Sequence, residues 1–207
     1  GIRNPLGGVA GWSEVYMNAS LESYLKGYND PRIKSYFNLA QDGRDKEGNI
    51  IKEVAGVKQL NSIEGEYKGV RQGTGVADNR YSTHSQTAIT TGSKIIVMSA
   101  AEVWFLRAEA ALRNYTSENV ENCYKQGITV SFAQWDASGV SEYLENTNKP
   151  AAYVDAFDKK FDADAPTSIT PKWDESAPLE LKLERIITQK WLAIYPEGCE
   201  AWAEQRR

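Results

Sequence analysis

The segment Pro178–Arg207 reads PLELKLERIITQKWLAIYPEGCEAWAEQRR and indicates the fold most clearly. Good helix formers and apolar residues at helical spacing predict an amphipathic helix over about 179–195. Proline and glycine within Tyr195-Pro196-Glu197-Gly198 predict its end. A second helix follows at once and would fold back as a hairpin. The chain ends before this helix has a C-cap, so we expect a fragment of a longer protein. The expected apolar face of the first helix comprises Leu179, Leu183, Ile186, Ile187 and Ile194, with Trp191 at its margin.

A second predicted hairpin covers residues 95–135. The pattern Ser99-Ala-Ala-Glu102 is typical of a capping box, and strong helix formers continue to Arg113. Glu109 and Arg113 stand four residues apart, which favours an ion pair on the helix surface. A second helix is expected to begin near residue 118, and the pair has tetratricopeptide size, about 34 residues. Its predicted apolar stripe comprises Val120, Tyr124, Ile128, Ser131 and Trp135.

The rest of the chain is predicted to be rich in loops. A possible helix spans residues 12–28 and ends at the turn Asn29-Asp30-Pro31. Residues 69–93 are rich in Gly, Ser and Thr, and a loop of this length is usually functional or disordered. The expected fold class is mainly α, with helical hairpins and long irregular loops. Weaker expectations are short helices at 141–144 and 150–157, an acidic loop at 158–170, and short strand pieces at 50–51 and 94–97.

Composition excludes several classes of protein. The 207 residues include 24 Lys and Arg and 28 Asp and Glu, for a net charge of -4, without a basic stripe. We therefore expect no nucleic-acid partner. No apolar run approaches the roughly 18–20 residues of a membrane span. The two cysteines, Cys123 and Cys199, are too few for a disulfide framework and are expected to be buried or half-buried free thiols.

The sequence offers little chemistry for catalysis. His84 is the only histidine, and a lone loop histidine is expected to be solvated or hydrogen-bonded. No serine lies in a G-x-S-x-G pattern, and Gly73-Thr74-Gly75 lacks the lysine of a phosphate loop. One histidine and two distant cysteines exclude the usual zinc sites. We therefore predict no enzyme, no metal site and no cofactor. Two alternatives stay open: calcium at one of two carboxylate clusters, and a carboxylate pair suited to glycoside hydrolysis. The clusters are Asp42, Asp45 and Glu47, and Asp155, Asp158, Asp162 and Asp164.

Aromatic residues in loop-like segments suggest a binding surface. The chain has 6 Trp, 11 Tyr and 5 Phe, and several of them lie outside the predicted helices. Flat rings stack on the C–H faces of sugars, while Arg and Gln side chains bind hydroxyl groups. The alternative is that these rings pack the loops onto the helical core. The predicted ligand-binding residues are Trp12, Tyr16, Arg71, Gln72 and Tyr81.

Three segments resemble the SusD/RagB family: Leu25–Arg32 (LKGYNDPR), Met98–Arg113 (MSAAEVWFLRAEAALR) and Ile186–Arg207 (IITQKWLAIYPEGCEAWAEQRR). The resemblance spans the whole chain but only the C-terminal portion of a family member. It implies a SusD-like α-α superhelix fragment in which residues 1–207 form a single domain. Residues 1–95 would be the loop-rich, ligand-facing part, and residues 96–207 the helical hairpin scaffold.

The resemblance also implies a function. Such proteins are surface-exposed lipoproteins of the outer membrane in gut-type Bacteroidetes. They capture a glycan or oligosaccharide without cleaving it and act with a SusC-like TonB-dependent transporter. The lipid anchor would lie outside this fragment. A tetratricopeptide-like scaffold that binds a peptide or the transporter alone is the alternative. Exposed aromatics in a helical groove would favour a peptide, whereas a shallow patch on the loops would favour a sugar.

Overall fold

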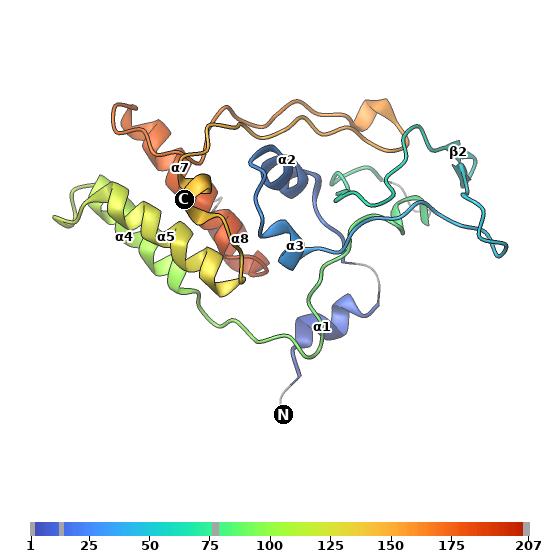
Figure 1. Cartoon of the computed structure of the whole chain (residues 1–207), viewed down its shortest axis with the longest axis horizontal. Helices are drawn as coiled ribbons and strands as arrows, with labels where there is room; N and C mark the ends of the chain where they lie inside the picture. The colour runs from blue at the N-terminus through green and yellow to red at the C-terminus, as the bar shows by residue number, and fades with distance from the viewer. Residues whose placement is uncertain (1–2, 13–14, 76–78, 205–207) are drawn as a thin grey trace. The chain divides into compact units, whose positions relative to one another are not determined.

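The computed structural model describes residues 3–12, 15–75 and 79–204. The chain divides into two compact units, and each unit is built from two separate segments of the sequence. The first unit joins Gly1–Ile95 to Pro150–Thr167, and the second joins Ile96–Lys149 to Ser168–Arg207 (Figure 1). The segment 150–167, expected in the helical scaffold, therefore folds with the loop-rich unit.

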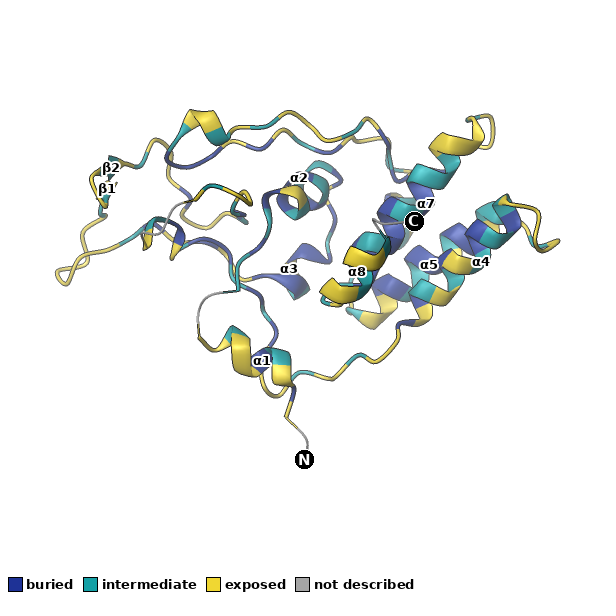
Figure 2. Ribbon diagram, turned by 180° about the vertical axis from the view of Figure 1, so that it is seen from behind, coloured by how far each residue is buried: buried dark blue, intermediate teal, exposed yellow. Residues whose placement is uncertain are grey.

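Helices build the second unit, which confirms the expected fold class. Helices α4 (Ala100–Leu112) and α5 (Val120–Gln134) form a hairpin, and α7 (Leu179–Ala193) packs against both. The short helices α6 (Val140–Leu144) and α8 (Gly198–Glu204) complete the unit. The helices turn their buried faces toward one another (Figure 2).

The α4–α5 contact is closest at Gly127. A Cβ atom at this position would lie 2.7 Å from the ring of Phe105, which is fully buried. Glycine therefore lets the ring of α4 rest directly on the backbone of α5. The ring centroids of Phe105 and Tyr124 are 6.1 Å apart in an edge-to-face arrangement, which is a favourable aromatic geometry.

Capping and surface pairs follow the sequence pattern in this hairpin. Ser99 is the N-cap of α4, and its Oγ accepts a hydrogen bond of 3.1 Å from the N–H of Glu102. The predicted pair between Arg113 and Glu109 is present at 2.9 Å. Asn119 caps α5, close to the expected start near residue 118. Polar caps thus set the helix starts that the sequence predicted.

The predicted apolar face of α7 is partly wrong. Leu179 is 48% exposed, whereas Gln189 and Lys190 are buried. These polar side chains are buried because each has a partner. The Nε2 of Gln189 lies 3.0 Å from the hydroxyl of Tyr143, and the Nζ of Lys190 lies 2.7 Å from a carboxylate oxygen of Glu204. The lysine thereby holds α8 against α7.

The first unit contains only short regular elements within its described residues. The predicted helix over 12–28 is only partly right, because residues 19–27 are helical whereas residues 15–18 before them are extended, and residues 13–14 lie outside the described ranges. Asn18 is the N-cap of the helix that begins at Ala19. Residues 150–157, which were also expected to be helical, contain no helix. The strand expected at 94–97 is absent. The elements are α1 (Pro5–Ala10), α2 (Ala19–Gly27), α3 (Ile33–Tyr36), β1 (Glu53–Val54), β2 (Val57–Lys58), η1 (Asn79–Tyr81) and η2 (Lys159–Phe161).

The turn between α2 and α3 contains a buried ion pair. Arg32 and Asp30 are both almost fully buried, and their side chains meet at 2.5 Å. Asn29 adopts a positive φ of 50°, a conformation that asparagine tolerates better than most residues. The LKGYNDPR segment therefore contains a structural turn in which Asp30 and Arg32 neutralise each other.

Three extended segments of the first unit form an antiparallel arrangement, here called the loop ladder. Residues 83–88 are central, with 15–18 on one side and 36–41 on the other. The backbone hydrogen bonds between them are 2.7–3.0 Å long. Tyr16 stands opposite Gln86, and Phe37 stands opposite Thr87. The long polar segment 69–93, expected to be a loop, is thus partly ordered by backbone pairing.

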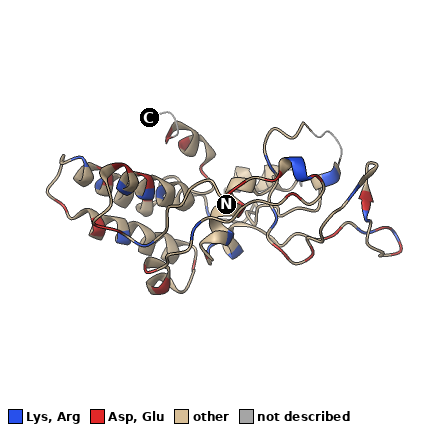
Figure 3. Ribbon diagram, turned by 90° about the horizontal axis from the view of Figure 1, so that it is seen from above, with Lys and Arg blue, Asp and Glu red and all other residues tan. Residues whose placement is uncertain are grey.

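The distribution of charge agrees with the expectation from composition, whereas the expected burial of the two cysteines holds for Cys123 and is wrong for Cys199. Figure 3 shows basic and acidic residues interspersed along the helices. None of the helices in the described ranges has the length and apolar composition needed to cross a membrane. Cys123 is buried, Cys199 is exposed, and both are free thiols.

Candidate functional site

Four of the five predicted ligand-binding residues lie at the surface of the first unit. Trp12, at the end of α1, is 71% exposed. Tyr16 is half-buried in the loop ladder. Arg71 and Gln72 are exposed, and an Nη atom of Arg71 lies 3.0 Å from each of the carbonyl oxygens of Phe161 and Asp162. The guanidinium of Arg71 is thus partly occupied by backbone acceptors.

Tyr81 lies in the interior. Only 7% of its surface is exposed, and its ring packs edge-to-face on Phe157 with centroids 5.7 Å apart. Its hydroxyl donates to Asp155 at 3.3 Å, and burial together with the Asp155 charge raises the pKa of Tyr81. We therefore place Tyr81 in the core of the first unit and not on the ligand face. Its aromatic character alone could not separate these two roles.

The loop ladder brings an aromatic ring and two amides into one row. Tyr16 is directly opposite Gln86, and the same register places Asn38 opposite Gln86 on the other side. Side chains directly opposite one another share a face of such a ladder. The row therefore presents a flat apolar ring beside amide groups, the combination that binds sugars. Sequence reasoning missed Asn38, which lies 48 residues before Gln86 in the chain.

A small depression beside this row is here called the polar hollow. Its volume is about 270 Å³. Amide and hydroxyl side chains make up most of its wall, together with the imidazole-bearing residue His84. The lining residues are Asn38, Leu39, Gln41, Ser82, Thr83, His84 and Gln86.

His84 differs from the expectation for a loop histidine. It is only 2% exposed, and neither ring nitrogen has a hydrogen-bond partner within the described part of the chain. Burial, followed by the positive charge of Lys68, lowers its pKa from 6.5 to about 4. The ring packs edge-to-face on Tyr81 with centroids 5.0 Å apart. Within the described residues no serine hydroxyl is hydrogen-bonded to the imidazole of His84, so the structure gives no support for a Ser-His relay.

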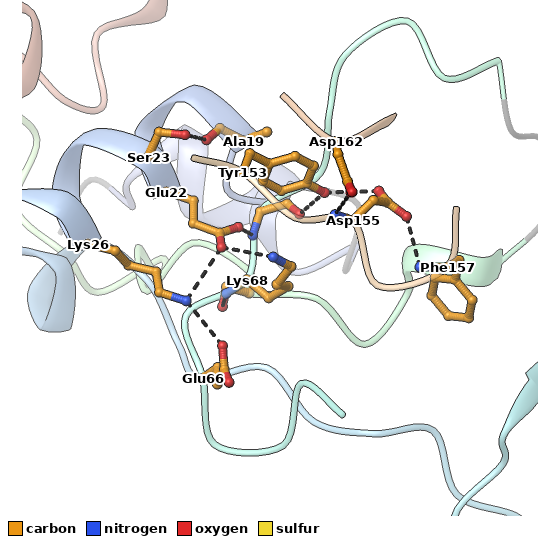
Figure 4. A network of polar contacts seen from close by, with 12 residues as sticks. Ala19, Glu22, Ser23, Lys26, Glu66, Lys68, Tyr153, Asp155, Phe157 and Asp162 are labelled. Carbon is orange, nitrogen blue, oxygen red and sulfur yellow. Dashed lines mark hydrogen bonds and ion pairs between the residues drawn. The ribbon is translucent and has the colours of Figure 1, made fainter. Parts of the chain in front are cut away.

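A second, larger depression of about 640 Å³, here called the charged groove, lies in the same unit. Its walls include residues 60–63 and four charged side chains that pair with one another (Figure 4). Glu22 accepts from Lys68 at 2.9 Å and from the backbone N–H of Gly69 at 2.7 Å. Lys26 bridges Glu22 and Glu66 at 3.5 and 3.1 Å. These pairs neutralise the groove.

Asp155 organises the interior next to this groove. It is fully buried, and its carboxylate lies 3.0 Å from the hydroxyl of Tyr153. The backbone N–H groups of Phe157 and Asp158 donate to it at 2.9 and 3.0 Å (Figure 4). This carboxylate, which the sequence placed in an acidic cluster, is thus committed to structural hydrogen bonds. Within residues 3–12, 15–75 and 79–204, no three acidic, His or Cys side chains form a group that could hold a metal ion.

A depression in the second unit is here called the helical groove. It measures about 390 Å³ and is lined by Leu106, Glu109, Ala110, Arg113 and Tyr115. Tyr115 is 78% exposed. Exposed aromatics therefore occur in both units, with Trp12 in one and Tyr115 in the other.

Comparison with known proteins identifies the family. The family model described as SusD-like, SusD and RagB outer membrane lipoprotein, matches residues 1–207. A crystal structure of a SusD homologue from Bacteroides vulgatus is 42% identical, with a TM-score of 0.83, over 100% of this chain and 40% of that chain. A chitin-binding SusD homologue from Flavobacterium johnsoniae is 37% identical, with a TM-score of 0.84, over 99% and 39% of the two chains.

A SusD-like protein from Bacteroides thetaiotaomicron is 35% identical, with a TM-score of 0.81, over 99% of this chain and 40% of that chain. The chain spans about two fifths of the length of these solved relatives. A search of curated proteins gave no match. The family match and these identities agree over the whole chain, which therefore belongs to the SusD-like family of SusD and RagB outer membrane lipoproteins.

Proposed function

We propose that this chain supplies part of the glycan-binding surface of a non-catalytic protein exposed on the outer membrane. The observation that carries the proposal is the row of Tyr16, Gln86 and Asn38 on the loop ladder. A ring at one end of a row that continues with two amides offers stacking to the C–H face of a sugar and hydrogen bonds to its hydroxyls. Trp12, Arg71 and Gln72 are further exposed residues of the same unit that suit this chemistry.

The family adds a cellular setting to this proposal. SusD-like proteins are outer membrane lipoproteins, and one homologue with a solved structure binds chitin. We infer that the whole protein is lipid-anchored through a segment outside this chain. It would deliver its glycan to a SusC-like TonB-dependent transporter. Because Asp155 and Glu22 are engaged in structural hydrogen bonds and ion pairs, the proposed role is capture without bond cleavage.

Calorimetry with chito-oligosaccharides, followed by a glycan array, tests the sugar-binding face. Tyr16→Ala should weaken the affinity for the bound glycan by about 1–3 kcal/mol, the loss expected when a partly buried aromatic contact is removed. Tyr115→Ala in the second unit is the matched control and should leave the affinity unchanged. If glycans bind equally well to the Tyr16 variant with its fold intact, the loop-ladder row is not the contact surface.

The helical groove supports a second candidate function, binding of a peptide. Tyr115 and Leu106 provide exposed apolar surface, while Glu109 and Arg113 provide a charged edge. The same pair of variants distinguishes the candidates, because Tyr115→Ala would then reduce peptide binding and Tyr16→Ala would not. Release of reducing ends from polysaccharides, measured on the unmodified protein, would instead reveal a hydrolase.

A further inference from the structure

The polar hollow contains one buried polar group whose hydrogen-bonding capacity is unused. His84 is 2% exposed, and within the described residues its two ring nitrogens have no partner. Most buried polar atoms in proteins have at least one partner, from protein, water or ligand. An imidazole with two unused nitrogens beside a hollow therefore points to a group that binds there.

The lining of the hollow is polar but carries no charge. It offers three amide side chains, two hydroxyl groups and the apolar side chain of Leu39, and none of its residues is Lys, Arg, Asp or Glu. Burial and the nearby charge of Lys68 lower the pKa of His84 to about 4, so the imidazole is neutral near pH 7. A neutral imidazole has one donor and one acceptor, which suits a pair of hydroxyl groups.

We propose that the polar hollow is a subsite for a single ring of an uncharged glycan, with His84 hydrogen-bonded to its hydroxyl groups. This inference rests on the proposed function and names the class of sugar. The volume of about 270 Å³ lies below the roughly 300–1,000 Å³ typical of drug-sized ligand sites, which suits one ring and not several. The outer amides, Asn38 and Gln41, would bind the hydroxyl groups nearer the solvent.

An anionic sugar fits this hollow poorly. Moving a carboxylate or sulfate out of water is costly unless a cation or several donors compensate for it. The cation that acts on the imidazole, Lys68, is already engaged by Glu22 at 2.9 Å. Its Nζ also lies 4.5 Å from the ring centroid of Tyr153, on the side of the charged groove. The subsite should therefore reject uronic acids.

Ligand binding must change the surroundings of the imidazole. Each ring nitrogen is buried without a partner, so a hydroxyl group reaches it only after a lining side chain moves or the ring turns. Since His84 is the only histidine, its imidazole gives one set of NMR signals that needs no assignment. These signals report on the hollow, which shares Asn38 and Gln86 with the loop-ladder row, whereas Tyr16 lies outside its lining.

The experiment titrates the labelled protein with methyl glycosides of glucose, galactose, xylose and N-acetylglucosamine, and with methyl glucuronide as the charged match to glucose. We expect saturable shifts of the imidazole signals with at least one neutral glycoside and none with the glucuronide. Either of two results overturns the inference: no response to any neutral glycoside, or a response to the glucuronide at equal or higher affinity.

Variants connect the response to the hollow. His84→Phe should lower the affinity of the responding glycoside at least about tenfold, because both imidazole hydrogen bonds are lost. Gln41→Leu changes an exposed lining side chain without touching the core and should also weaken binding severalfold, which serves if the His84 variant fails to fold. Asn61→Ala, in the charged groove, is the control. Unchanged affinity in folded Gln41→Leu contradicts the subsite.

Failure of this inference differs from failure of the proposed function. If a glycan binds in a Tyr16-dependent manner while the imidazole signals stay constant, only the subsite is refuted. If a neutral glycoside shifts the imidazole signals while Tyr16→Ala leaves glycan affinity unchanged, the loop-ladder row is refuted and the hollow stands.

Discussion

Lowering the pH should destabilise the first unit through His84. Its pKa is lowered from 6.5 to about 4 in the folded state, by burial and then by Lys68, with Asp155 opposing. Between these values the unfolded chain binds a proton that the folded chain does not. Stability therefore falls as the pH falls from about 6.5 to about 4. The difference in pKa corresponds to about 3 kcal/mol of unfolding free energy.

The measurement combines NMR with denaturant unfolding. The chain has a single histidine, so the midpoint of its imidazole titration is read directly and should lie near 4. Urea unfolding at several pH values between 7 and 4.5 should show stability falling progressively, toward the full loss near pH 4. His84→Phe keeps a ring against Tyr81 but removes the titrating group, so its stability should depend less on pH.

The comparison with the variant is needed because a carboxyl group of the second unit also changes its protonation as the pH falls. Burial raises the pKa of Glu102, and its contribution changes in the opposite direction, since a raised carboxyl pKa favours the folded state as the pH falls. The difference between the unmodified protein and His84→Phe isolates the histidine. An imidazole midpoint near 6.5, or parallel stability curves for the two proteins, would refute the burial argument.

Substitutions at four further positions test the ion pairs, packing and helix capping of the two units by urea unfolding. Glu22→Gln removes one member of a buried pair with Lys68, leaving an uncompensated charge, and should cost about 3 kcal/mol, whereas Glu66→Gln at an exposed pair should cost less than about 0.5 kcal/mol. If Glu22→Gln and Glu66→Gln lowered the unfolding free energy equally, the burial of the Glu22–Lys68 pair would be contradicted. Gly127→Ala should destabilise by about 1–2 kcal/mol despite better helix propensity, because the new methyl group overlaps a buried ring; a gain in stability would show that the ring moves aside freely. Ser99→Ala should lower the unfolding free energy by about 1 kcal/mol through loss of the N-cap. Ser99→Asp should keep most of the stability of the unmodified protein, because Asp also caps helices well.

The helical scaffold was predictable because its signals are local. Ser99 begins α4, and the spacing of Tyr124, Ile128 and Ser131 places these residues on the buried side of α5. Such caps and stripes depend on residues within one or two turns of each other. They are therefore visible in one sequence without knowledge of the rest of the fold.

Partners far away in the chain limited the prediction for α7. Periodicity assigned its buried face to aliphatic residues, yet Lys190 is more deeply buried than Leu179. The lysine is tolerated in the interior because Glu204 approaches it from α8. Burial of a charged side chain follows from its counter-charge, and only the folded structure shows where that counter-charge lies.

The candidate site could be predicted only in part. Tyr16 and Gln86 belong to loop-like sequence, and their pairing depends on backbone hydrogen bonds that carry no side-chain pattern. In the structure Ser85, Thr87 and Ile89 are buried and alternate with less buried residues, the period expected of an extended segment. Their small polar side chains concealed it among turn residues. His84 carried no sequence signal for burial.

Because the first unit is built from two separate segments of the sequence, it is completed late in protein synthesis. Tyr153 and Asp155 lie in the segment that completes the first unit, and 150–167 leaves the ribosome well after residue 95. Translating the 72 residues from 96 to 167 takes roughly 4 to 14 seconds at ordinary rates. During that interval Gly69 and its neighbours have no hydrogen-bond partner from the later segment. The first unit therefore stays incomplete while residues 96–149 are made, and it can close only after residues 150–167 are available.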